Sequence, residues 1–468
     1  MRKYVKRGDK KKKNEKKLIS YLEPILDKLR QKQVKTNLIR LVTGIIRERT
    51  IQMWRISTDR REYEKFHNML NGTLKNTVDV LKVNSSLLNK ELLYAKGKLS
   101  LSFIYDGSDI RKGESLSSEH LGWVKNLGGK WVRGYNSFNA VRVEKGKGAI
   151  GLVSCVPYSN RDPHFLSEKE RKLFESGKLL DKEREKEIEA YLEHEDMYNQ
   201  KHVYKSSIQS IHDTVRSVNE NVVINHIFDR GHDDNELFEF IDDLGDKFTI
   251  RLKNNRNSPM YTFDEKTQKE KPLKWADLPF GNRGKKSYQK VCFNKRVYVK
   301  PSAVFEWEDI IIQGRAYSMI RVRFYTYDGQ SIFKEPMLIV TNYKVNDALM
   351  AQFVYEMYLQ RSKIEGVFKF LKSVLGWETF KVQDFESIKN IIALCFFVGS
   401  YFYEIQDELT KDDNVQWICE LGGGKGTVSR HFFLKGIEKL LIVHQVEQFK
   451  QDFNISNQQV QDALELII

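Results

Sequence analysis

Residues 358–372, which read YLQRSKIEGVFKFLK, bring together four side chains that can do chemistry: Tyr358, Arg361, Glu365 and Lys372. On one unbroken helix these side chains would share a stripe about 60° wide. A neighbouring apolar face is expected to contain Phe353, Met357, Ile364, Phe370, Leu371 and Val374. A carboxylate flanked by cations suits a divalent metal ion beside bound phosphates. The alternative is a solvated face held by ordinary ion pairs.

Two aspartates each follow an apolar β run. The pattern predicts one strand that ends at Asp106, before a turn, and a second strand, Val222–Phe228, that runs into Asp229. Acids at the carboxyl ends of neighbouring strands point into the crevice where α/β sheets bind ligands. Three clustered carboxylates repel one another, and two divalent ions about 3.5–4 Å apart would relieve that repulsion and serve phosphoryl transfer. The alternative for each aspartate is a turn or helix cap.

The composition favours a polyanionic partner. The chain has 468 residues, 40% hydrophobic and 30% charged, with 78 Lys and Arg against 63 Asp and Glu and a net charge of +15. This length allows two to four domains, and nucleic acid is the commonest partner of such a basic protein. Anionic membrane is the alternative, but the longest apolar run, residues 391–398, is too short to span a bilayer.

Other motifs exclude several classes of site. The four cysteines lie far apart with no C-x-x-C pair, which argues against a disulfide framework or a zinc site and favours a reducing cytoplasm. The glycine-rich residues 422–427 do not satisfy the P-loop pattern and predict a turn. Residues 1–17 hold ten basic and two acidic side chains, which indicates a disordered arm that binds phosphates or aids solubility.

These motifs resemble those of bacterial insertion-sequence transposases of the DDE class, in the group with a Y-(2)-R-(3)-E-(6)-K signature. The four residues within 358–372 match that signature in type and spacing. YDGS at 105–108 resembles the first-Asp motif, and FDRG at 228–231 resembles the second. Segments 133–143 and 337–342 resemble sequence around the core strands of the family.

The resemblance implies an α/β fold with an RNase H-like catalytic core, interrupted by a mostly antiparallel β insertion. It also implies a metal-dependent nuclease and strand transferase that cleaves terminal inverted repeats and joins the 3′ ends to target DNA. Two Mg²⁺ (or Mn²⁺) ions would be held by Asp106, Asp229 and Glu365. DNA phosphates would be bound by Tyr358, Arg361 and Lys372. The expected partners are double-stranded DNA and a second copy of the chain in a paired-end complex, in a bacterial cytoplasm at the nucleoid, without a membrane.

One position departs from the family. Its best-known members carry a Trp just before the strand that corresponds to residues 338–341, where the ring stacks on a flipped base during hairpin formation. Here the residue is Met337, which lacks an aromatic face, so the hairpin route is left open. Trp307 or Tyr317 would be substitutes, unless they are core residues. Arg230 and His232 are candidates for contacts to the flipped nucleotide or for holding the turn.

The pattern and the resemblance together predict six parts. These are a basic disordered arm (1–17), a helical DNA-binding region (18–97), the first part of the RNase H-like core (98–253), the β insertion (254–337), the second part of the core with the catalytic helix (338–410), and a helical C-terminal region for dimerisation or end binding (411–468). An ordinary helical domain remains the alternative for residues 18–97, because periodicity does not separate the two.

Two other functions fit part of the pattern. A structure-specific nuclease or resolvase would share the sheet and the acids, but it does not need the β insertion or the basic helical N-terminus. A non-catalytic DNA-binding repressor would need none of the three acids. Short inverted repeats flanking the encoding DNA would favour the transposase, and divalent-metal binding would argue against the repressor.

Overall fold

The computed structural model describes residues 18–74, 100–112, 117–144, 148–177, 182–193, 197–256, 260–264, 269–293, 296–409 and 413–452, together with positions 456 and 458 and apart from positions 24, 28, 127, 275, 277 and 279. The predicted N-terminal arm and the segment 75–99 therefore lie outside the described residues.

Twelve strands form one mixed sheet. Its order is β2-β3-β1-β5-β6-β14-β13-β12-β7-β8, with β4 also paired to β3 and β9 also paired to β12. The core strands are β1 (Ser100–Arg111), β2 (Gly122–Lys125), β3 (Trp131–Glu144), β4 (Gly148–Tyr158), β5 (Val223–Phe228), β6 (Lys247–Arg251) and β14 (Met337–Thr341). Strands β1, β5 and β6 are parallel, whereas β3 and β14 run antiparallel to their neighbours.

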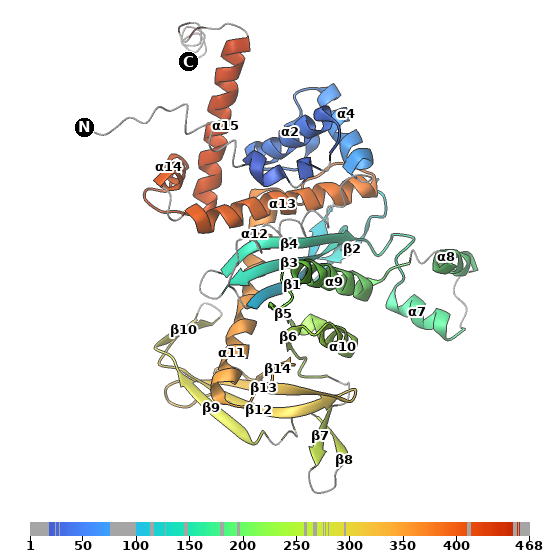
Figure 1. The fold of residues 1–468 in the computed structure, drawn as a ribbon, viewed down its shortest axis with the longest axis vertical. Helices are drawn as coiled ribbons and strands as arrows, with labels where there is room; N and C mark the ends of the chain where they lie inside the picture. Colours follow the sequence, from blue (N-terminus) through green and yellow to red (C-terminus); the bar gives the residue numbers. More distant parts are fainter. Residues whose placement is uncertain are drawn as a thin grey trace.

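Helices cover both faces of the core sheet (Figure 1). Alternate residues of β1 enter different cores, as Ile104 and Phe103 show. The core with Ile104 includes α12 (Lys363–Val374) and α13 (Phe385–Leu409), and the core with Phe103 includes α9 (Gln200–Val218) and α10 (Asn235–Asp243). The result is a three-layer α/β/α arrangement, as the fold class predicted from the sequence requires.

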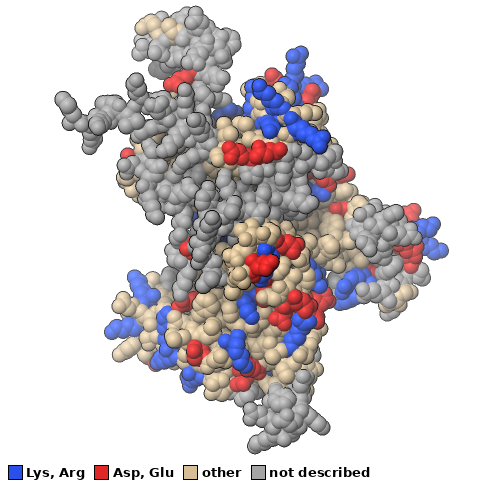
Figure 2. Space-filling view, viewed as in Figure 1, with Lys and Arg blue, Asp and Glu red and all other residues tan. Residues whose placement is uncertain are grey.

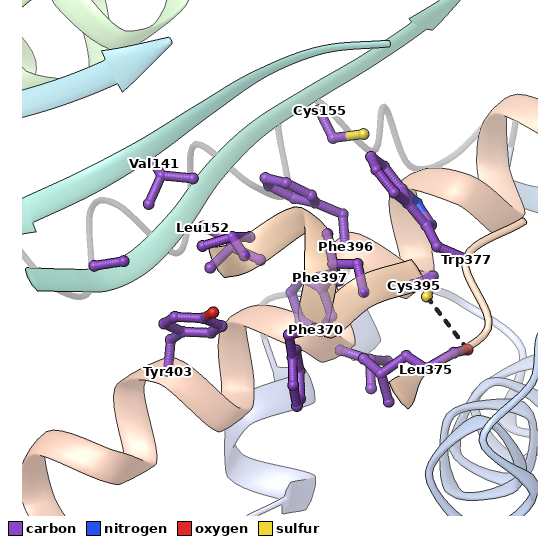
Figure 3. Packing of buried hydrophobic residues seen from close by; sticks show 14 of the residues in the cluster. Val141, Leu152, Cys155, Phe370, Leu375, Trp377, Cys395, Phe396, Phe397 and Tyr403 are labelled. Atoms are coloured by element: carbon purple, nitrogen blue, oxygen red, sulfur yellow. Dashed lines mark hydrogen bonds between the residues drawn. The ribbon is translucent and has the colours of Figure 1, made fainter. Parts of the chain in front are cut away.

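Helix α13 is the central helix of its layer. Its side chains pack against β4 and α12 around Leu152, Phe370 and Phe396, as Figure 3 shows. Among the described residues, Phe385–Tyr403 is the one helical segment long and apolar enough to cross a membrane, and 89% of that window is buried inside the protein. The window is longer than the continuous apolar run 391–398, because it also takes in flanking residues of α13.

The β insertion is mostly antiparallel, as predicted, and it continues the core sheet through the pairing of β13 with β14. Its strands are β7 (Met260–Asp264), β8 (Lys269–Leu273), β9 (Asn282–Ser287), β10 (Lys290–Phe293), β11 (Arg296–Val299), β12 (Ser302–Ile312) and β13 (Arg315–Tyr325). Residues 282–287, although rich in Lys, Arg and Asn, form β9, because all six pair with residues 302–307 of β12.

Helices form both ends of the described chain. The first group comprises α2 (Lys32–Glu48), α3 (Met53–Ile56), α4 (Arg60–Asn68) and the π-helical turn η1 (Met69–Thr73), and the second comprises α14 (Asp413–Leu421) and α15 (Arg430–Asp452). The glycine-rich residues 422–427 form the turn between α14 and α15, as predicted. Figure 2 shows Lys and Arg side chains gathered over the N-terminal helices. The short helices α7 (Glu168–Glu175) and α8 (Lys182–Glu193) lie beyond the edge of the sheet.

Candidate active site

Three carboxylates from distant parts of the chain converge on one guanidinium group. The Nη2 atom of Arg361 lies 2.7 Å from Oδ2 of Asp106 and 3.4 Å from Oδ2 of Asp229. Its Nη1 atom lies 2.5 Å from Oε1 of Glu365. The structure thus brings together the three acids that were singled out from the sequence, with a cation between them.

The parallel pairing of β1 and β5 explains how the two aspartates meet. The ladder runs from Ser100 opposite Val223 to Ile104 opposite Ile227, and each aspartate lies two residues beyond that last pair. The predicted end of β1 at Asp106 is wrong, because β3 continues to pair with β1 as far as Arg111. Strand β5 ends at Phe228, so the sheet opens beside Asp106 where its parallel neighbour stops.

The carboxylate of Asp229 is fixed by its own turn. It caps the 3₁₀ turn η2 (Arg230–His232), and its Oδ1 accepts a hydrogen bond of 2.8 Å from the Gly231 amide. The same atom lies 2.9 Å from Nδ1 of His232, whose ring is 7% exposed and contacts the rings of Phe228 and Tyr204. His232 therefore lies beneath Asp229, where it orients the carboxylate.

The segment 358–372 is not the single helix that was predicted. Helix α11 (Ala348–Leu359) ends after Tyr358, the 3₁₀ turn η4 (Gln360–Ser362) carries Arg361, and α12 carries Glu365. The break turns Arg361 toward both aspartates, while the Glu365 side chain stays 63% exposed at the mouth of the site. Tyr358 is buried beside Arg251. On the predicted apolar face, Ile364, Phe370 and Leu371 are buried, but Phe353 is exposed.

Lys372 lies away from the three carboxylates, near the end of β1. Its Nζ donates to the carbonyl of Asp109 at 2.5 Å and lies 3.1 Å from Oε1 of Glu378. Glu378 also binds Arg111, at 3.1 Å, so two cations share one carboxylate. Lys372 lies seven positions after Glu365 on α12, which corresponds to about 10 Å along the helix.

The two aspartates titrate in opposite directions. Burial is the largest influence on Asp106, and together with the nearby charge of Asp229 it outweighs Arg361 and raises the pKa of Asp106 to about 6. Burial also acts on Asp229, but the hydrogen bond and charge of His232, with Arg361 and the Gly231 amide, lower its pKa to about 2. Without a metal ion, the pair thus combines one readily protonated carboxyl with one that stays ionised.

Residues 204–398 match the family model described as the transposase DDE domain. This segment is similar to the transposase DDE domain. The resemblance to DDE transposases is thereby confirmed at the level of the family, and the matched segment includes Asp229, Arg361 and Glu365, whereas Asp106 precedes it. No curated protein matches the chain.

The donor set of Asp106, Asp229 and Glu365 fits hard divalent cations, because all three side chains offer carboxylate oxygens. Among the described residues, no group of three or more His, Cys, Asp or Glu side chains has a geometry that could hold a metal ion. The reason is visible in the contacts: the guanidinium of Arg361 occupies the centre of the carboxylate group. The carboxylates are therefore arranged around positive charge, and Arg361 must move aside for them to ligate metal.

The residues considered for base flipping differ in how far they are exposed. Met337 is the half-buried first residue of β14 and packs against the core, while Arg230 is the first residue of η2. Trp307 and Tyr317 are 6% and 3% exposed and belong to the core of the β insertion, so they offer no ring to a base.

A buried polar network below the site escaped the sequence analysis. The Tyr105 hydroxyl lies 2.8 Å from Nδ1 of His226, whose Nε2 lies 3.0 Å from Oδ2 of Asp246. Asp246 also contacts His212 at 2.9 Å and Arg216 at 2.8 Å. Because Tyr105 precedes Asp106 and His226 lies on β5, the network fixes β1 and β5 against α9. The only sequence signal for it is a histidine inside the apolar run 222–228.

Proposed function

We propose that the protein is a DNA transposase that binds the terminal inverted repeats of a mobile element, cleaves them and joins the 3′ ends to target DNA. The observation that carries this proposal is the convergence of Asp106, Asp229 and Glu365 on one cationic centre beside an open end of β5. The transposase DDE domain over residues 204–398 supports it, and such a domain implies an RNase H-like core.

In this proposal Asp106, Asp229 and Glu365 would hold two Mg²⁺ or Mn²⁺ ions. The bound ions would supply charge neutralisation and would activate the attacking water or 3′-hydroxyl for in-line phosphoryl transfer. His232 and the Gly231 amide keep Asp229 ionised and correctly turned, so this ligand is ready at any physiological pH. Asp106 loses its proton before it can serve as a ligand.

Arg361 has two roles in turn. In the metal-free protein its guanidinium neutralises the three carboxylates, whose mutual repulsion would otherwise disfavour the folded state. Once the carboxylates serve as ligands, the guanidinium is free to bind a phosphate oxygen with its fork of N–H donors. Lys372 and Arg111, which share Glu378, would bind the backbone further from the cleaved bond.

The direct test uses supercoiled plasmid that carries the DNA flanking the encoding element, incubated with the purified protein and Mg²⁺. We expect the wild-type protein to cleave at the element ends and to insert them into a second plasmid. Asp106→Asn, Asp229→Asn and Glu365→Gln, which remove a charge and keep the shape, should each lose both reactions but keep end binding.

Asp109→Asn is the matched control, because Asp109 lies on the same strand three residues further and faces away from the three carboxylates. It should retain cleavage. Cleavage without insertion by the wild-type protein would support the structure-specific nuclease instead, and full cleavage by any of the three variants would remove that acid from the proposed site.

A further inference from the structure

On the hairpin β2–β3, at the edge of the sheet, two tryptophans alternate with two cations. Trp123 lies opposite Arg133, and Lys125 lies opposite Trp131. Directly opposed residues and residues two apart on one strand point to the same side, so all four side chains share one face. Trp123 and Trp131 are 39% and 61% exposed, which is unusual for so large an apolar side chain unless it contacts a partner.

Each cation of this hairpin lies over a ring, and Nη1 of Arg133 also donates to the Leu121 carbonyl at 3.4 Å. The guanidinium carbon of Arg133 lies 4.2 Å from the centre of the Trp123 ring, and Nζ of Lys125 lies 5.2 Å from that of Trp131. Among the residues that the structure describes, neither cation forms an ion pair with a carboxylate. Both charges therefore remain available to an anion, while the rings keep them in place.

A tight turn gives the hairpin a defined shape. The Asn126 side-chain oxygen accepts hydrogen bonds from the amides of Gly128 and Lys130, both at 2.9 Å, and the Asn126 amide donates to the Lys130 carbonyl at 2.8 Å. Gly129 has a φ of 76°, which a side chain would disfavour. The exposed rings are thus presented by an ordered ribbon.

The ribbon lies on the same face of the sheet as the candidate active site. Asp106 pairs with Asn139, and Arg133 and Trp131 follow on that face of β3, six and eight residues away. At about 3.3 Å per residue, this places them roughly 20–26 Å from Asp106 along the strand, the length of about six to eight nucleotide steps at 3.4 Å. The cations around Glu378 lie beside the intervening part of β1.

We propose that the exposed face of the β2–β3 hairpin binds single-stranded DNA, with bases stacked on Trp123 and Trp131 and phosphates bound by Lys125 and Arg133. Alternating aromatic faces and cations are what sequence-tolerant recognition of unpaired strands requires, because every base offers a ring face and every linkage a charge. Bases within a duplex do not expose those faces. This binding site goes beyond the proposed cleavage reaction, and it does not need the metal ligands.

Fluorescence anisotropy with a labelled 20-mer of deoxythymidine, in EDTA and with the full chain, tests the proposal. The double variant Trp123→Ala/Trp131→Ala should bind the oligonucleotide about 30-fold or more weakly. The double variant Lys125→Gln/Arg133→Gln should lower the slope of log affinity against log salt by about 1.4. Trp131→Phe, which keeps a ring, should retain most of the affinity.

Trp417→Ala is the matched control, because Trp417 is 43% exposed on α14, away from the hairpin. It should bind as the wild-type protein does. Asp229→Asn should also keep full affinity, which separates this site from the proposed chemistry. Unchanged binding by Trp123→Ala/Trp131→Ala would overturn the proposal. A change in the oligomeric state of this double variant, measured by light scattering, would also overturn it. So would a loss of affinity for a 20-base-pair duplex as large as the loss for the single strand.

Discussion

Charge is handled in opposite ways at the candidate active site and at the β2–β3 hairpin. At the site, the half-buried Asp106 and Asp229 share Arg361 with Glu365, and no member can change without affecting the others. At the hairpin, Lys125 is exposed and Arg133 is half-buried, each beside its own ring. Mutations at the candidate active site should therefore have non-additive effects, whereas mutations at the hairpin should have additive effects.

The largest effect expected is loss of cleavage without additivity. Asp229→Asn and Glu365→Gln should each reduce the rate of end cleavage by about 10³-fold or more, and the double variant should be hardly slower, because groups that act together fail together. Single-turnover cleavage assays of the three proteins measure this. If the fold losses in rate of the two single variants multiply in the double variant, the acids act independently. That result would contradict a shared site.

The next effect concerns the stability of the metal-free protein. Arg361→Ala leaves three carboxylates without their shared cation, two of them half-buried, and should lower the free energy of unfolding by about 3 kcal/mol. Millimolar Mg²⁺ should restore part of that loss, since ions that bind the folded state stabilise it. Thermal unfolding in EDTA and in Mg²⁺ gives the comparison. Arg133→Ala at the hairpin is the control and should change stability by at most about 0.5 kcal/mol.

A smaller effect follows from the raised pKa of Asp106. Because the folded protein holds this proton up to about pH 6 and the unfolded chain releases it near its ordinary value, the folded state is favoured at low pH and loses that advantage as the pH rises through 6. The wild-type protein should therefore lose about 1–3 kcal/mol of stability relative to Asp106→Asn between pH 4 and pH 7. Denaturant unfolding of both proteins at each pH, in EDTA, measures the difference. A constant difference would mean that Asp106 titrates normally.

The sequence was most informative where a local pattern coincides with a functional position. Asp229 follows an apolar run and heads a glycine-containing turn, so its place could be predicted from neighbours in the chain. Asp106 was found for a reason that is only partly right, because β1 continues past it through pairing with β3, and such non-local pairing leaves no local signal.

Two features could not be predicted for physical reasons. The 3₁₀ break at residues 360–362 contains no Pro or Gly, and only tertiary packing turns Arg361 toward the aspartates. The β2–β3 hairpin depends on a register in which Trp123 meets Arg133, a pairing that neither segment specifies alone. The strands of the β insertion were easier to predict, since β12 and β13 are long and alternate in polarity.

The smallest effect expected is on the stability of hairpin variants. Trp131→Ala removes a ring that is mostly in water, so the free energy of unfolding should change by no more than about 0.5 kcal/mol. By contrast, His226→Ala in the buried network should cost about 2–4 kcal/mol, because Tyr105 and Asp246 would lose their shared partner. Chemical denaturation curves of both variants check the contrast. A large loss for Trp131→Ala would mean that the ring is part of the core.

Titration of the protein with Mn²⁺, followed by electron paramagnetic resonance in the presence of a DNA end, tests the central claim most directly. Two ions held about 3.5–4 Å apart by Asp106, Asp229 and Glu365 should give a spin-coupled signal at two Mn²⁺ per chain. The signal should vanish in Asp229→Asn and persist in Asp109→Asn. A wild-type protein without the coupled signal, or a signal that Asp229→Asn leaves intact, would contradict the assignment of the three acids.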